Sequence, residues 1–516
     1  MAATCAAASL QGPLLSGVAA GQSPASPAAI AEAARQHHRR NAGEILRELR
    51  RLLELPNVAV SRADIERNAR LLLAMFERRG FTTRLLTAGD AAPAVFAERQ
   101  TPGATRTLVF YAHYDGQPVD AAQWTDDPWR ATLRTGPLED GGQVVPWETL
   151  PAVLPAEARM YGRSSSDDKA PIVAFLAAVD ALATAKIPPG VHLKVFLEGE
   201  EEAGSPHLEE LLRAHAELLH GDLWVFGDGP VHQSRKPLVS FGVRGTIGLE
   251  MTLFGPARAL HSGHYGNWAP NPAAELATLL AGMRDDEGRI LIEGIAERVR
   301  PLEPDEQAAS AALPDIDTDL ARTLALGRTE QVRPRLADSL LVPAINIRGL
   351  QAGAVGEGAS NAIPTHARAS IDFRLVPDLT PGDVTRLVER HLAGNGYHVI
   401  HHDPSADERR SHPRLVQLAW GTGYPGYRAS MSLPASRAVV RIVEEAAGQP
   451  VVAVPTLGGS LPLYLFADIL GAPIITVPIV NHDNNQHAAN ENLRLQNLWD
   501  GIEIYAALIA RLGEVW

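Results

Sequence analysis

The chain of 516 residues has a single cysteine, Cys5. One cysteine excludes a disulfide framework and any thiolate-based metal site, so a metal would need His, Asp or Glu as ligands. Positive charge is also scarce: 47 Lys and Arg residues against 60 Asp and Glu residues give a net charge of −13, which argues against a nucleic-acid partner. Long apolar runs are missing as well, because Asp180, Asp468 and several prolines interrupt the most hydrophobic windows. We therefore expect no membrane partner.

The first 40 residues differ from the rest. They hold no charged residue before Glu32 and no basic residue before Arg35, and the stretch 10–20 is mildly apolar. Two interpretations fit this pattern: a disordered alanine-rich tail, or a degenerate secretory signal whose basic start is missing. A signal would make the protein periplasmic or secreted, and otherwise we expect it to be cytoplasmic. We do not assign residues 1–40 to the fold.

The remaining composition is that of a globular protein, with 45% hydrophobic and 21% charged residues. The length favours two domains and allows three. Helical leucine spacing and short apolar runs alternate after residue 40, which predicts an α/β domain with a mixed, mainly parallel sheet. We expect helices over 44–55, 62–79, 169–186 and 208–219, and strands over 107–112, 191–197 and 223–226.

The pattern changes at residue 246. Here the sequence predicts two helices on a small antiparallel sheet, an α+β arrangement, with strands over 246–254, 344–350, 366–375 and 397–401 and helices over 272–283 and 384–392. The α/β pattern then resumes, with expected elements at 435–447, 451–454, 473–477 and 493–512. We therefore predict an α/β domain in two parts, 41–245 and 406–516, interrupted by a smaller α+β domain over 246–405.

Acidic and imidazole side chains follow several of the predicted buried strands. Taken singly, each has an ordinary explanation such as strand-end capping, a helix cap or a solvated glutamate run. Strand ends in one α/β sheet converge on one edge, however, and carboxylates packed there raise each other's pKa unless cations neutralise them. Oxygen and imidazole ligands suit two Zn²⁺, Mn²⁺ or Co²⁺ ions. The residues concerned are His113, Asp115, Asp167, Glu201, Glu202 and Asp228, with His487 as a candidate to complete the set.

Taken in order, these motifs resemble a di-zinc metallopeptidase family. This family (clan MH) includes glutamate carboxypeptidase, carnosine and non-specific dipeptidases, acetylornithine deacetylase and succinyl-diaminopimelate desuccinylase. The amino-acid sequences of the motifs are closest to those of the dipeptidase branch. The resemblance extends from about residue 41 to the end of the chain. The matching pieces are Ala-His113-Tyr-Asp115, Tyr-Gly-Arg-Ser-Ser-Ser-Asp167-Asp-Lys, Glu198-Gly-Glu-Glu201-Glu202-Ala-Gly-Ser, Phe-Gly-Asp228, Leu-His261-Ser-Gly, Asp-Phe-Arg374-Leu-Val-Pro, Gly458-Gly-Ser460-Leu-Pro and His487-x-x-Asn-Glu.

The resemblance implies two metal ions, zinc or else manganese or cobalt, and a role for each matching residue. His113 and Asp228 would bind one ion, Glu202 and His487 the other, and Asp167 would bridge them. Asp115 would orient His113, Glu201 would be the general base, and the peptide bond between Asp167 and Asp168 would be cis. The inserted domain would be a lid and dimerisation domain that forms a homodimer, with His261 reaching the partner's active site. The substrate-binding residues would be Arg374, Asn361 and Ser460.

Some positions depart from the family pattern. Ser164 and Ala170 replace glycines, and both are small enough to be tolerated. Thr456-Leu457 stands where the dipeptidases often have Arg-Glu, which weakens the case for carnosinase-like specificity. About twenty extra residues over 139–158 lengthen a loop that could shape the mouth of the pocket or only the surface.

The function implied is metal-dependent hydrolysis of a peptide or amide bond beside a free carboxylate, with small peptides or N-acyl amino acids as substrates. A dipeptidase or carboxypeptidase is favoured, and an N-acyl-amino-acid deacylase is the alternative. A two-metal phosphoesterase would need a basic or glycine-rich phosphate cradle, which is missing from the sequence. A metal-free binding or dimerisation module would be favoured by a lost ligand, and none is lost.

Overall fold

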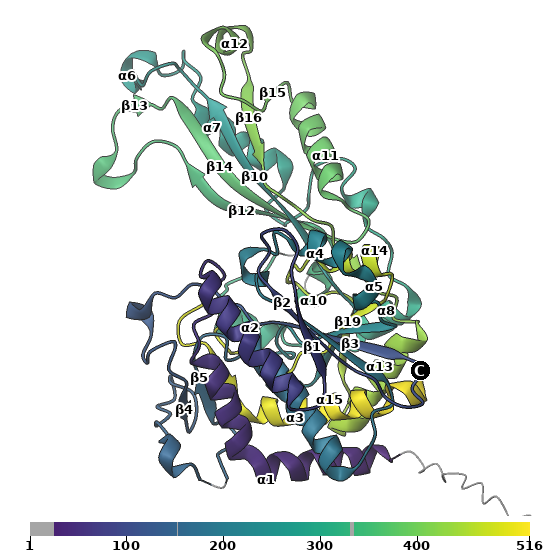
Figure 1. Ribbon diagram of the computed structural model, residues 1–516. Coiled ribbons are helices and arrows are strands. Elements are labelled where there is room, and N and C mark those ends of the chain that lie inside the picture. The colour runs from purple at the N-terminus through teal and green to yellow at the C-terminus, as the bar shows by residue number, and fades with distance from the viewer. Residues whose placement is uncertain (1–24, 152, 331–334) are drawn as a thin grey trace, which may run out of the picture.

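The computed structural model describes residues 25–151, 153–330 and 335–516. They form an α/β domain and a smaller domain that is inserted into it and projects from it (Figure 1). The α/β domain contains an eight-stranded sheet in the order β1-β2-β6-β3-β7-β19-β8-β18. Its strands are β1 (Thr82–Leu86), β2 (Ala94–Arg99), β3 (Thr107–His113), β6 (His192–Glu198), β7 (Leu223–Phe226), β8 (Leu238–Ser240), β18 (Val452–Val454) and β19 (Ile474–Thr476).

This sheet is mixed and mainly parallel. The central strands β6, β3, β7 and β19 run parallel to one another, while β1 and β2 add an antiparallel edge and β8 pairs antiparallel with β19. The predicted fold class is therefore confirmed. Because parallel strands are covered on both faces, they are continuous apolar runs, as in Thr107–His113.

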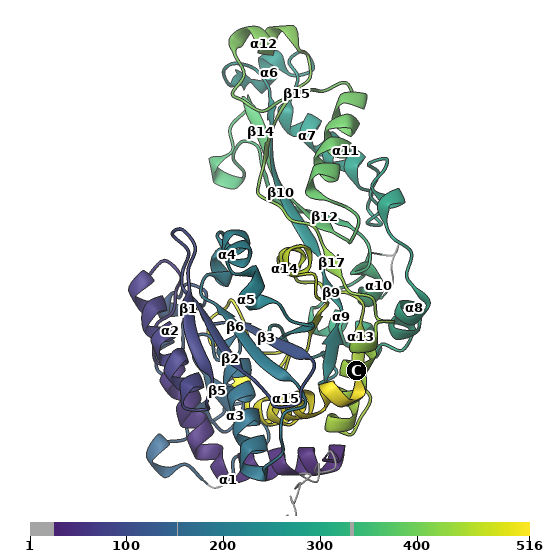
Figure 2. The same cartoon turned by 45° about the vertical axis from the view of Figure 1, so that its right-hand side comes forward.

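Helices cover both faces of the sheet (Figures 1 and 2). On one face lie α1 (Pro27–Leu53), α3 (Lys169–Ala185), α13 (Pro434–Ala447) and α15 (Leu495–Val515). The other face packs against α4 (Leu208–Ala214), α5 (Ala216–Leu219) and α14 (Leu463–Leu470), while α2 (Arg62–Glu77) packs at β1 and β2. Helix α3 is apolar around most of its circumference because it lies between the sheet and other helices. The single helix expected over 208–219 is instead two, separated at His215.

The N-terminal prediction needs correction. Residues 27–40 belong to α1 rather than to a tail, with Ser26 accepting a capping hydrogen bond and Pro27 in the first turn. Alanine-rich sequence favours a helix, and Ile30 and Ala34 recur at helical spacing and are buried. The rest of the predicted tail or signal, residues 1–24, lies outside the described residues.

The inserted domain has a five-stranded sheet in the order β12-β14-β10-β16-β15. Its strands are β10 (Gly245–Phe254), β12 (Ala344–Gln351), β14 (His366–Leu375), β15 (His398–Ile400) and β16 (Leu415–Trp420). Helices α7 (Pro272–Met283) and α11 (Pro381–Gly394) share a hydrophobic core with this sheet, as an α+β domain requires. The predicted boundary at residue 405 is wrong, because β16 pairs antiparallel with β10 and so belongs to the inserted domain.

Shorter elements complete the chain. The α/β domain adds β4 (Thr132–Arg134), β5 (Arg159–Tyr161) and β20 (Asn492–Arg494), and β9 (Gly242–Val243) pairs with β17 (Tyr427–Arg428). The inserted domain adds β11 (Leu260–His261), β13 (Ala362–Ile363), α6 (Ser262–Tyr265) and α12 (Ala406–Ser411). The acidic stretch before β12 forms α8 (Pro304–Ala311), α9 (Asp317–Thr323) and α10 (Leu336–Ser339). Among the described residues, no helix has both the length and the apolar character that a membrane crossing requires.

Candidate metal centre

His113 is the last residue of the central strand β3, and its imidazole lies between two carboxylates. Its Nε2 atom is 2.9 Å from an oxygen of Asp167, and its Nδ1 atom is 3.4 Å from an oxygen of Asp115. The Asp115 carboxylate also accepts hydrogen bonds from the backbone N–H groups of Glu201 and Glu202, at 3.1 and 3.0 Å. Asp115 is fully buried and thus holds both the imidazole and the glutamate segment in place.

Asp167 contacts a second imidazole. Its other oxygen is 3.1 Å from Nε2 of His487, which is itself 3.3 Å from an oxygen of Glu202. Although burial alone would raise the pKa of Asp167, hydrogen bonds from His113 and His487 hold it well below its usual range. The peptide bond between Asp167 and Asp168 is cis, as the family resemblance implies.

All five residues predicted as metal ligands meet at this edge of the sheet. His113, Asp167 and Asp228 form one group, and Asp167, Glu202 and His487 form another. In each group, one candidate ligand atom per residue lies within 4.8 Å of the others. Asp167 is common to both groups, which is the arrangement expected of a bridging carboxylate between two ions.

The chemistry of these groups suits divalent cations. Burial and the nearby charge of Asp167 raise the pKa of Asp228 to about 6 and that of Glu202 to about 7. Such shifts arise where carboxylates are crowded together away from water without a cation to neutralise them. Oxygen and imidazole donors without thiolate fit zinc, manganese or cobalt, so the residues present fit two such ions.

The three consecutive glutamates point to different partners. Glu200 accepts hydrogen bonds from the backbone of Ala92 and from His207, away from the metal centre. Glu202 accepts a hydrogen bond of 2.7 Å from Gln117 beside His487. Glu201 belongs to neither ligand group, yet its carboxylate lies 3.9 Å from His113 Nε2. Burial raises the pKa of Glu201 well above its usual range, which favours proton acceptance near neutral pH.

Arg374 and Ser460 lie together where β14 meets the α/β domain. Arg374 donates to Ser460 Oγ at 2.8 Å and to Asp372 at 2.9 Å. Arg244 has no role predicted from the sequence. It is buried, and burial together with the charge of Arg374 lowers its pKa to about 10. Two arginines beside one aspartate leave one excess positive charge, which suits a carboxylate ligand.

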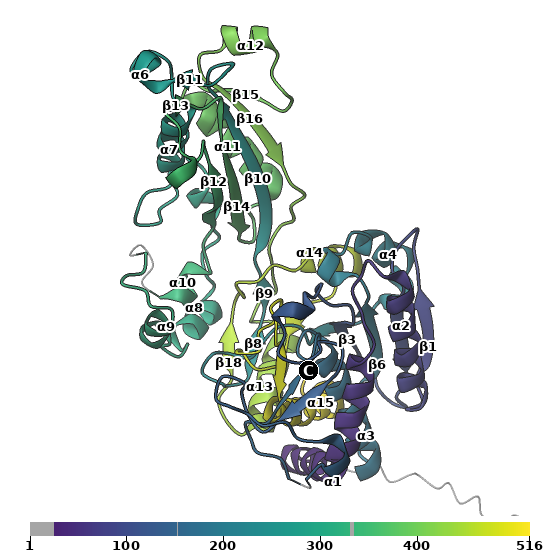
Figure 3. The ribbon, with the colours of Figure 1, turned by 90° about the vertical axis from the view of Figure 1, so that its left-hand side faces the viewer.

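His261 and Asn361 lie elsewhere. They lie at the short β11–β13 pair, where the backbone N–H of Ser262 donates to the carbonyl of Asn361 at 2.9 Å. This pair and α6 are at the end of the inserted domain farthest from the α/β domain (Figures 1 and 3). Within one chain, the structure therefore does not bring His261 and Asn361 to the metal centre.

Glu491 is a further residue to which the sequence analysis gave no role. It is fully buried, and its carboxylate accepts five hydrogen bonds. The donors are the backbone N–H groups of Ser164, Ser166 and Asp167, the hydroxyl of Ser166 and the guanidinium of Arg163. The sequence feature that could have identified Glu491 is its position four residues after His487, in the motif His-x-x-Asn-Glu. Glu491 joins the segment that carries His487 to the loop that carries Asp167.

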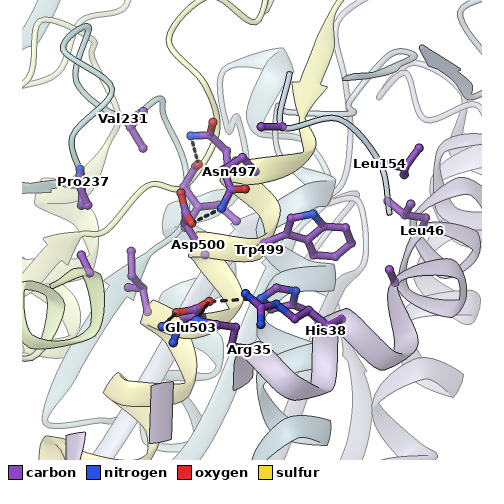
Figure 4. Close-up of a pocket in the computed structure, with 18 of the residues that line it drawn as sticks. Arg35, His38, Leu46, Leu154, Val231, Pro237, Asn497, Trp499, Asp500 and Glu503 are labelled. Atoms are coloured by element: carbon purple, nitrogen blue, oxygen red, sulfur yellow. Dashed lines mark hydrogen bonds and ion pairs between the residues drawn. The ribbon is translucent and has the colours of Figure 1, made fainter. Parts of the chain in front are cut away.

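A cavity of about 580 Å³ lies apart from this centre, between α1, α15 and residues 150, 151 and 153–156. Figure 4 shows Arg35 and His38 of α1 directed toward Glu503 of α15, and His38 stacked on Trp499. The extra residues of the 139–158 loop thus contribute to this cavity through Leu150 and Leu154. Among the described residues that line it, none is a predicted metal ligand.

Comparisons with known proteins agree with this arrangement. Residues 109–511 match the family model described as Peptidase family M20/M25/M40. The Cys-Gly metallodipeptidase dug1 of Schizosaccharomyces pombe is 26% identical over 431 residues, which cover 82% of this chain and 83% of that protein. The Beta-Ala-His dipeptidase of Homo sapiens is 26% identical over 432 residues, covering 82% of this chain and 78% of that one. The solved structure of the metallo-carboxypeptidase Sso-CP2 from Sulfolobus solfataricus has a TM-score of 0.74 at 25% identity, over 91% of this chain and 99% of that one.

Proposed function

Because the chain belongs to peptidase family M20/M25/M40, we propose that it is a metal-dependent dipeptidase that cleaves the peptide bond next to a free carboxylate. One observation carries this proposal: two groups of carboxylate and imidazole ligands share Asp167. The excess positive charge at Arg374, which donates to Ser460, suits the free carboxylate of the substrate. The metallodipeptidases and the metallo-carboxypeptidase to which the chain is similar support the same class of reaction.

In this proposal, His113 and Asp228 would hold one divalent ion, Glu202 and His487 would hold the second, and Asp167 would contribute to both sites. Zinc is the ion favoured by this mixture of nitrogen and oxygen ligands, although manganese and cobalt accept the same donors. When bound, the ions supply Lewis acidity to the scissile carbonyl and lower the pKa of the attacking water.

The side chains of the protein perform the proton transfers and bind the substrate. Glu201 accepts a proton from the attacking water and then delivers it to the leaving amine. Asp115 keeps His113 in the orientation and tautomer that a metal ligand needs. Arg374, supported by Ser460 and Arg244, binds the terminal carboxylate of the substrate by charge-assisted hydrogen bonds.

We further propose that the protein acts as a homodimer through the inserted domain. Within the described part of the chain, β12 pairs only with β14, so its other edge is free to pair with a second copy. Apolar side chains on or just after this edge strand are exposed, with Ile347 at 41%, Leu350 at 61% and Val355 at 88%. Such a dimer would carry His261 and Asn361 toward the active site of the partner, where His261 stabilises the oxyanion.

Hydrolysis assays on zinc-loaded protein test the function. We expect turnover of unblocked dipeptides and loss of turnover after chelation, with Glu201→Gln as the inactive control. N-acetylated amino acids provide the comparison: turnover of these compounds without turnover of dipeptides would indicate a deacylase and contradict the proposal.

A further inference from the structure

Three side chains form a row across the strands that join the two domains. Thr246 on β10 pairs directly with Arg374 on β14, and on its other side it exchanges two backbone hydrogen bonds of 3.0 Å with Tyr424. Residues that face each other in antiparallel strands project from the same face of the sheet. The Tyr424 ring therefore lies on the same face as Arg374, with Thr246 between them.

Tyr424 is half-buried beside a second tyrosine. Its ring centroid is 6.3 Å from that of Tyr464, and the two ring planes are only 13° apart. Tyr464 is in the first turn of α14, four residues after Ser460, and α14 lies where the two domains meet (Figure 3). The two rings thus form one aromatic surface beside the Arg374–Ser460 pair.

Tyr424 also interacts electrostatically with the catalytic base. Burial and then the negative charge of Glu201 raise the pKa of Tyr424 to about 12, while Arg374 lowers it. The phenol is therefore within electrostatic range of both Glu201 and Arg374, the residues assigned to proton transfer and to carboxylate binding.

The covalent structure of a dipeptide fixes how far its second residue extends from the scissile bond. Only one nitrogen and one α-carbon separate the scissile carbonyl from the terminal carboxylate. When the carboxylate is held at Arg374 and the carbonyl is near Glu201, the α-carbon of the C-terminal residue lies between them, and its side chain projects from that point. We infer that Tyr424 and Tyr464 form the subsite for this side chain, and that the preferred substrates are dipeptides with a large apolar or aromatic C-terminal residue. This inference rests on the proposed function.

The chain segment that leads to Tyr464 is apolar. Leu457 and Leu461 are partly buried against the same hydrophobic cluster as Tyr464. Leu457 belongs to the Thr456-Leu457 pair that stands where the dipeptidases often have Arg-Glu, so this loop has no charge at the two positions. Apolar neighbours and stacked rings favour burial of a hydrocarbon or aromatic side chain over a charged one.

Steady-state kinetics with Ala-Phe and Ala-Gly test this assignment on the zinc-loaded protein. We expect the wild type to show a kcat/KM at least about tenfold higher for Ala-Phe, a discrimination typical of apolar pockets. Tyr424→Ala and Tyr464→Ala should each remove most of this preference by raising KM for Ala-Phe, with less than about a threefold change for Ala-Gly. Tyr424→Phe keeps the ring and should keep the preference.

Trp499→Ala, which removes an aromatic ring from the separate cavity of Figure 4, is the control and should leave the preference unchanged. Equal kcat/KM for both dipeptides in the wild type would overturn the subsite alone. An equal loss of kcat/KM for both dipeptides in Tyr424→Ala and Tyr464→Ala would also overturn the subsite. Hydrolysis of neither dipeptide would instead overturn the proposed function, and the subsite with it.

Discussion

Replacing Glu491 by Gln should weaken both the fold and the metal centre. In the structure, one oxygen of Glu491 accepts hydrogen bonds from Arg163 at 2.7 Å and Ser164 at 2.9 Å, and the other accepts three more. An amide of the same shape can keep the three bonds at one oxygen. Its NH₂ group would then face two donors, the guanidinium of Arg163 and the backbone N–H of Ser164.

The size of the stability loss follows from the buried guanidinium of Arg163, which the substitution leaves without a negatively charged partner. Arg163 is nearly fully buried, and removing the charge partner of a buried ion costs about 3–5 kcal/mol. Its remaining contacts, with the carbonyl of Ala488 and the face of Trp124, do not supply a negative charge. Since Glu491 also holds the backbone of Asp167, metal affinity should fall about 10–100-fold, as for other residues that orient ligands.

Urea unfolding of the metal-free protein and zinc titration by calorimetry measure the two effects. Glu217→Gln, a substitution at an exposed glutamate on α5, serves as the matched control and should change neither quantity. If Glu491→Gln unfolds at the same urea concentration as the wild type and binds zinc equally well, the positioning role is refuted.

Three further outcomes are expected. Glu201→Gln should bind two metal ions but lose about 10²–10⁴-fold in turnover, while Glu200→Gln should remain active. The reverse result in kinetic assays of the metal-loaded variants would identify Glu200 as the general base instead. In the metal-free protein, burial raises the pKa of Asp228 to about 6 and of Glu202 to about 7, so these two carboxyl groups bind more protons in the folded state than in the unfolded one. Their contribution to stability should therefore fall as pH rises from about 4 to 7. Replacing Asp228 by Asn removes one of these groups and should raise Tm at pH 7 relative to Tm at pH 4.5, and an unchanged difference between the two Tm values would contradict this. Finally, His261→Ala mixed with Glu201→Gln should regain activity if His261 acts across a dimer, and two inactive variants that stay inactive on mixing and subunit exchange would argue against it.

The sequence predicts those features that depend on local pattern. A short apolar run such as Thr107–His113 forms a buried strand, and acidic groups at the ends of parallel strands converge by topology. This convergence predicted a metal site at the edge of the sheet, while the choice of the five ligands rested on the family resemblance. The register within Glu200–Glu202 came from the sequence of the motif, and in the structure the three glutamates have different partners.

Features that depend on distant pairing could not be predicted. Leu415–Trp420 is a six-residue strand whose domain is decided by its pairing with β10, more than 160 positions earlier in the chain. Tyr424 is brought to Arg374 by Thr246, which pairs with both of them, and Arg244 lies two residues before Thr246 in the chain. The start of α1 was missed for another reason: its alanine-rich sequence is compatible with a tail until packing buries Ile30.

The metal content of purified protein tests the central claim most directly. Inductively coupled plasma mass spectrometry after equilibration with zinc and removal of excess metal gives the number of ions per chain. The shared ligand groups predict two ions in the wild type, one in His487→Ala and fewer than one in Asp167→Asn, because Asp167 belongs to both groups. A single ion in the wild type, or two ions retained in Asp167→Asn, would contradict a two-metal centre bridged by Asp167.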